Sequence, residues 1–229
     1  MKRFWNNVAV VETDDGYSIT LDGRAVRTPA RAELLAPSKE LADAIAHEWR
    51  GCGETVDPRQ MPLTGLANAA IDRVAADPEA FSSGLAQYAQ GDLLCYRAEG
   101  PSSLVARQSE TWNALLDWAR RRYDVDFACT AGITHVPQAE ATVARLTHAV
   151  AVLDPYRLAA LSPLVTIGGS LVVALAVLEQ AVPPETAWEA VSLDDRWQLE
   201  QWGADSEAEA ALDHRRRDFL SAAQFLSLL

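Results

Sequence analysis

The chain has 229 residues, of which 49% are apolar and 23% are charged, and its formal net charge is −12. This composition is typical of a globular protein, and the excess of negative charge argues against nucleic acid or an anionic membrane as the binding partner. The length is sufficient for one large domain, or for a small domain joined to a larger one.

The first part of the chain has the pattern of β-strands. Apolar residues recur at every second position through residues 8–28, and two Asp-Gly steps interrupt them as tight turns would. A helix should follow, with Ser38 as its N-cap and with Leu41, Ile45 and Trp49 along one face. The sequence therefore predicts a small antiparallel β-meander with one covering helix.

After this segment the pattern changes to helix. We expect an α+β protein with a β-rich N-terminal domain of residues 1–60 and a larger all-helical domain of residues 61–229. Beyond residue 60 the expected helices span residues 63–76, 77–88, 101–123, 138–153, 163–180, 184–191, 193–202 and 205–228.

One apolar stretch has nearly the length of a membrane helix. Leu158–Leu178 contains no charged residue, but Ser162-Pro163 interrupts it with a helix-start signal. We expect a helix that ends near Leu161 and a second, buried helix from Pro163, without stable membrane insertion. The N-terminus lacks an apolar signal core, so the expected location is cytoplasmic.

The motifs of common catalytic and cofactor sites are missing from the sequence. It has no phosphate-binding Gly-x-x-x-x-Gly-Lys loop, no Gly-x-Ser-x-Gly elbow and no His-Glu-x-x-His pair. The cysteines, Cys52, Cys95 and Cys129, form no Cys-x-x-Cys pair and are expected to be free, buried thiols. We expect no catalytic residue, no metal site and no cofactor.

The C-terminal segment 185–209 favours recognition of a protein. It contains eight acidic residues and one arginine, and three of the chain's seven tryptophans lie in it. Acidic patches with aromatic anchors suit protein partners. The candidate partner-binding residues are Glu200, Trp202, Asp205, Asp195 and Glu207.

Two of these candidates have specific structural expectations. Asp195 fits two roles, a contact with the partner or a capping box with Ser192 at the start of a helix. Glu200 lies within a helix and has no capping role, and the nearest arginine in sequence is Arg196. The spacing therefore predicts that Glu200 has no strong structural role of its own.

A set of short motifs over essentially the whole chain resembles the assembly chaperones of F-type ATP synthase, in their bacterial form. The motifs are Leu21-Asp-Gly-Arg24, Thr28-Pro29, Glu48-Trp49, Asp57-Pro58, Met61-Pro-Leu-Thr64, Ala70-Ile-Asp72, Asp92-Leu-Leu-Cys-Tyr-Arg97, Gln108, Gly169-Ser-Leu171, Gln198, Trp202-Gly203 and Asp205. The chain departs from the family pattern at Asp194-Asp195, where Asp-Glu is usual, and at Ala204, where Glu is usual.

The resemblance implies a β-rich N-terminal part and a larger helical part. It also implies ATP-independent binding of the α subunit of the catalytic head, which prevents aggregation of that subunit before the hexamer forms. A monomeric chaperone is expected. Two alternatives remain: a hydrolase that uses Asp92 or Glu200, and a peripheral membrane protein that uses residues 158–178.

Overall fold

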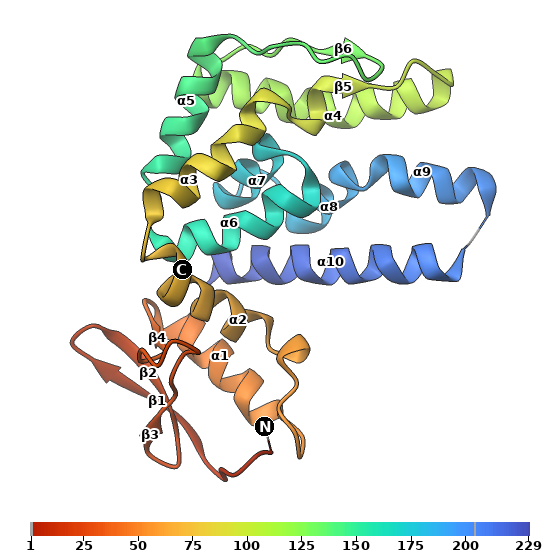
Figure 1. Ribbon diagram of the computed structural model, residues 1–229. Coiled ribbons are helices and arrows are strands. Elements are labelled where there is room, and N and C mark those ends of the chain that lie inside the picture. Colours follow the sequence, from red (N-terminus) through yellow and green to blue (C-terminus); the bar gives the residue numbers. More distant parts are fainter. Residues whose placement is uncertain (1, 204) are drawn as a thin grey trace. The chain divides into compact units, whose positions relative to one another are not determined.

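The computed structural model describes residues 2–203 and 205–229, which form two compact units (Figure 1). The first unit is the chain up to Pro78, together with residues 154–160 and 224–229. The second unit consists of residues 79–153 and 161–223.

The first unit contains a small antiparallel sheet. Its strands are β1 (Val8–Thr13), β2 (Gly16–Leu21), β3 (Arg24–Ala25) and β4 (Leu35–Ala36). The strand β2 pairs with each of the others, so the predicted meander is confirmed and β4 extends it. Gly16 has a φ of +131°, and a Cβ atom there would lie 2.6 Å from the carbonyl oxygen of Ala36. Only glycine fits this turn without displacing β4.

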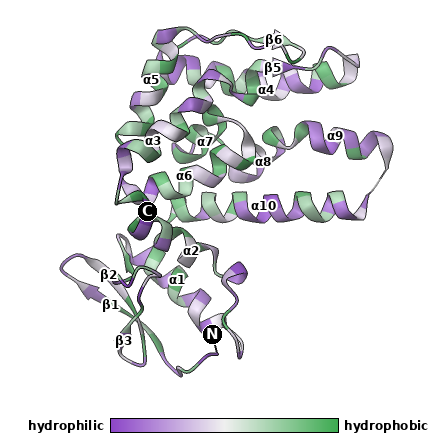
Figure 2. Ribbon diagram, in the orientation of Figure 1, coloured by the Kyte–Doolittle hydropathy of each residue, from purple (hydrophilic) through white to green (hydrophobic). Residues whose placement is uncertain are grey.

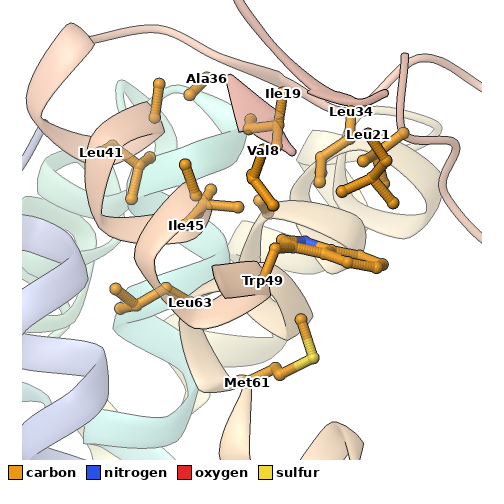
Figure 3. Packing of buried hydrophobic residues seen from close by; sticks show 14 of the residues in the cluster. Val8, Ile19, Leu21, Leu34, Ala36, Leu41, Ile45, Trp49, Met61 and Leu63 are labelled. Atoms are coloured by element: carbon orange, nitrogen blue, oxygen red, sulfur yellow. The ribbon is translucent and has the colours of Figure 1, made fainter. Parts of the chain in front are cut away.

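The covering helix is also confirmed. Helix α1 (Lys39–Gly51) begins at Ser38, whose Oγ accepts a hydrogen bond of 3.1 Å from the Leu41 backbone N–H. Leu41, Ile45 and Trp49 are buried against the sheet, as Figure 3 shows. The Trp49 ring meets the buried ring of Trp5 edge-on at a centroid distance of 5.2 Å.

Carboxylates join the rest of the first unit to this core. Glu48 of α1 caps helix α2 (Pro62–Ala69) by accepting hydrogen bonds of 2.8 Å from the backbone N–H groups of Leu63 and Thr64. Asp72, in the π-helical turn η2 (Ala70–Val74), accepts a 2.6 Å hydrogen bond from the Thr28 hydroxyl. These residues belong to the sequence motifs, and their contacts stabilise the fold.

The second unit is mainly helical. Its helices are α3 (Pro78–Ala86), α4 (Ser102–Tyr123), α5 (Glu140–Ala151), α6 (Pro155–Gly168), α7 (Leu171–Leu178), α8 (Pro184–Val191), α9 (Leu193–Trp202) and α10 (Ser206–Ser227). The first residues of α6 and the last of α10 belong to the first unit. The larger region is not entirely helical, because β5 (Tyr96–Arg97) and β6 (Thr130–Ala131) form a short parallel ladder.

The predicted helix boundary at Ser162-Pro163 is wrong. Helix α6 continues through Pro163 and ends at Gly168, and the next helix begins after Ser170. Gly169 adopts a left-handed φ of +65°, which stops α6, and the Ser170 hydroxyl caps α7 by accepting from the Val173 N–H at 3.1 Å. In the described residues, no helix combines the length and apolar character needed to cross a membrane.

A buried carboxylate supports the start of α7. Asp92 is fully buried and accepts hydrogen bonds from the Ser170 hydroxyl at 2.8 Å and from the Val172 and Leu94 N–H groups at 2.9 and 3.0 Å. Burial raises the pKa of this carboxyl group, and the hydrogen bonds oppose that rise. The first turn of the apolar α7, green in Figure 2, thereby gains acceptors for its N–H groups.

Candidate partner-binding surface

The acidic segment of the sequence forms a helical hairpin of α9 and α10. The two helices run side by side (Figure 1), and every residue of α9 is at least partly exposed. Gly203 ends α9 with a φ of +88°, a left-handed conformation that suits glycine. Figure 2 shows hydrophilic residues along much of both helices. The hairpin therefore presents side chains from both helices to solvent.

A groove of about 340 Å³ lies between the two helices of the hairpin. Its lining residues are Asp195, Gln198, Leu199, Trp202, Gly203, Asp205, Ala208, Ala211, Leu212 and Arg215. The Trp202 side chain is 78% exposed, whereas Trp188 of the preceding helix is buried. The groove therefore combines an exposed aromatic ring, an apolar lining and charged residues at its rim, as partner-binding sites on proteins commonly do.

Asp195 is held by an arginine of α10. Its Oδ2 accepts a 2.8 Å hydrogen bond from Arg215 Nη2, which joins the two helices of the hairpin. The alternative capping box is wrong, because the Ser192 hydroxyl donates at 2.7 Å to the carbonyl oxygen of Trp188. Ser192 has φ −97° and ψ 9°, outside the extended region that an N-cap side chain needs.

Glu200 has an ion-pair partner that the local sequence does not reveal. Its Oε2 lies 2.6 Å from Nη1 of Arg107 in α4, whereas the only arginine that the local sequence offered was Arg196. The side chains are 45% and 52% exposed, which limits the stabilisation to that of a surface pair. Glu200 lies in the last turn of α9, where a carboxylate is unfavourable unless a cation compensates it.

Asp205 and Glu207 lie at the start of α10. The Asp205 Oδ1 accepts a 3.0 Å hydrogen bond from the Glu207 N–H, so Asp205 acts as an Asx cap of the helix. The Glu207 side chain is exposed in the first turn, where the helix dipole favours negative charge. Ala204, at which the chain departs from the family pattern, lies outside the described residues.

Arginines from elsewhere reduce the local negative charge. Arg107 and Arg215 pair with Glu200 and Asp195, and Arg216 of α10 pairs with Glu185 at 2.7 Å. The charge counted over residues 185–209 therefore overstates the negative field of the folded surface. The exposed Asp205 and Glu207 at the start of α10 are among the acids that these three arginines do not pair with.

Several residues of the groove were not predicted from the sequence. Leu199, Leu212 and Arg215 line it beside the predicted residues. The spacing of Ala208, Ala211, Leu212 and Arg215 along α10 follows one helical face, and this pattern could have identified the lining. Asp194, beside Asp195, has a different role, since its Oδ1 accepts a 2.8 Å hydrogen bond from the buried Gln108 side chain.

The residues named for a hydrolase are used in other ways. The Asp92 carboxylate is inaccessible and is occupied by a hydroxyl and two backbone N–H groups, while Glu200 pairs with Arg107. Among the described residues, no group of three or more His, Cys, Asp or Glu side chains could hold a metal ion. The positions of Asp92 and Glu200 therefore favour structural roles over catalysis.

Known proteins resemble this chain over almost its full length. The mitochondrial protein atp12 of Schizosaccharomyces pombe is 26% identical over an aligned length of 238 residues, and the alignment covers 99% of this chain and 82% of that protein. The crystal structure of Atp12 from Paracoccus denitrificans is 40% identical, with a TM-score of 0.94 over 99% of this chain and 97% of the other. A crystal structure from Agrobacterium tumefaciens is 38% identical, with the same TM-score over 99% of this chain and 85% of the other.

The sequence model of one family matches more than half of the chain. Its description is ATP12 chaperone protein, and the match covers residues 2–120. The chain therefore belongs to the ATP12 chaperone family.

Proposed function

We propose that this protein is an assembly chaperone of the F-type ATP synthase. It binds the α subunit of the catalytic head and prevents that subunit from aggregating before the hexamer forms. Membership of the ATP12 chaperone family supports this proposal, as does the resemblance of the sequence motifs to assembly chaperones of that enzyme.

The partner-binding surface in this proposal is the α9–α10 hairpin. The observation that carries it is the exposed ring of Trp202 at an apolar groove with a charged rim. Large aromatic side chains that become buried on association commonly contribute much of the binding energy. Asp205 and Glu207 add negative charge beside the groove, which favours an α-subunit segment that combines apolar and basic side chains.

The chaperone acts by holding its client and needs no nucleotide. The sequence lacks the phosphate-binding loop with its lysine that many ATP-hydrolysing proteins use, which supports an ATP-independent mechanism. Shielding an exposed apolar surface needs only a binding equilibrium that favours the complex over self-association. We further propose that the protein is a monomer in the bacterial cytoplasm, which size-exclusion chromatography and cell fractionation would test.

Light scattering tests the proposed function. Unfolded α subunit is diluted into buffer with and without an equimolar amount of this protein, and each mixture is prepared with and without ATP. We expect the protein to suppress scattering to the same extent in both nucleotide conditions. An acidic globular protein of similar size serves as the control. Unchanged scattering would contradict α-subunit binding, and protection only with ATP would contradict the nucleotide-independent mechanism.

A further inference from the structure

Two cysteines meet at the short parallel ladder of the second unit. The ladder pairs Tyr96 with Thr130 and Arg97 with Ala131. The residues immediately before these pairs are Cys95, which is the last residue of the 3₁₀ turn η4 (Leu93–Cys95), and Cys129, so the two cysteines lie at the same end of the ladder. Both are free thiols in the structure.

The geometry at this position is suitable for a disulfide. Neighbouring strands lie about 4.8 Å apart, and disulfides join residues whose Cα atoms are about 4.4–6.8 Å apart. The two thiols also interact. Burial raises the pKa of Cys95, and the charge of the Cys129 sulfur and a hydrogen bond with Cys129 raise it further.

The two thiols differ in accessibility. The Cys129 residue is exposed, whereas Cys95 is only 1% exposed. An oxidant in solution therefore reaches Cys129 first. Burial and the nearby Asp92 carboxylate keep Cys95 protonated and protect it from direct reaction. The pair thus has the arrangement of an attacking thiol backed by a second, resolving thiol.

We propose that Cys95 and Cys129 form a reversible disulfide when the protein meets a small-molecule disulfide such as oxidised glutathione. The Cys129 thiolate attacks one sulfur of the oxidant and releases the first glutathione thiolate. Cys95 then loses its proton and attacks the Cys129 sulfur, and the second glutathione thiolate leaves. The two cysteines are oxidised, and one glutathione disulfide is reduced to two thiols.

The cross-link would constrain the helix that supports the partner-binding hairpin. Residues 95–129 enclose α4, which supplies Arg107 to Glu200 and Gln108 to Asp194 of α9. A closed loop of this length stabilises the folded state mainly by restricting the unfolded chain, and a rise in Tm of roughly 5–10 °C is expected. Oxidation would therefore raise the free energy of unfolding of the folded unit in which α4 contacts α9.

Peptide mapping of the full-length protein tests this proposal. The protein is incubated with excess oxidised glutathione, alkylated, and digested without reductant for mass spectrometry. We expect one peptide pair linked through Cys95 and Cys129, and a rise in Tm that dithiothreitol reverses. Cys129→Ser should abolish both results, whereas Cys52→Ser, the matched control, should retain them.

Three outcomes would overturn the proposal. They are a stable glutathione adduct on Cys129 without the link to Cys95, disulfides only between two chains, and complete alkylation of all three cysteines after oxidation. A linked peptide without a rise in Tm would contradict the expected stabilisation.

Discussion

Replacing Trp202 by alanine should weaken binding of the α subunit strongly and leave the fold almost intact. A tryptophan side chain buries about 150–250 Å² in a contact, and 78% of this one is exposed before binding. At about 25 cal/mol per Å², covering the exposed share contributes about 3–5 kcal/mol. Ordering the ring on binding offsets part of this gain, so we expect a loss of about 2–4 kcal/mol, or at least about 30-fold in Kd.

Calorimetric titration of the α subunit into each variant measures this loss, and thermal unfolding measures stability. The Tm should change by no more than about 2 °C, because the ring makes little contact within the chaperone. Ile133→Ala is the matched control, since Ile133 is an apolar residue of the same unit that is 100% exposed and lies outside the hairpin. A Trp202→Ala protein that folds normally and binds within about threefold of wild type would refute the assignment of Trp202 as the anchor.

Other predictions concern carboxylates of the second unit. Glu200→Gln should lower the free energy of unfolding by only about 0.2–1 kcal/mol, because the pair with Arg107 is half exposed; a loss above about 2 kcal/mol in urea unfolding would contradict this. Asp92→Asn should lower the Tm by several degrees in calorimetry, because an amide NH₂ group would face a buried donor; an unchanged Tm would argue against its capping role. Burial raises the pKa of Asp92 in the folded protein. The free energy of unfolding of the wild type should therefore fall, relative to that of Asp92→Asn, as the pH rises from about 4 to the raised pKa. The same pH dependence of stability in both proteins would contradict this expectation.

Local sequence signals identified the elements whose caps and turns lie close together in the chain. Ser38 precedes α1 and caps it, and the Asp-Gly steps lie at the turns of the sheet. The boundary between α6 and α7 was misplaced because two signals compete within a few residues. Pro163 is accommodated within α6, whereas the left-handed Gly169 and the capping Ser170 separate the helices.

Contacts between distant segments could not be predicted from local patterns. The pairs of Glu200 with Arg107 and of Asp194 with Gln108 join residues that are 93 and 86 positions apart. Similarly, the Tyr156 hydroxyl donates to the Leu35 carbonyl oxygen at 3.0 Å, within the first unit. Helical periodicity shows which residues share a face of a helix, but it does not show which other element that face meets.

Hydrogen exchange of the chaperone, free and in complex with the α subunit, tests whether the α9–α10 hairpin is the partner-binding surface. The exchange of backbone amides in residues 195–212 is compared between the free protein and the complex, with residues 8–21 of the sheet as the internal reference. We expect slower exchange across the end of α9 and the start of α10 when the α subunit is bound. A complex that forms while exchange in residues 195–212 stays unchanged would contradict the hairpin as the partner-binding surface.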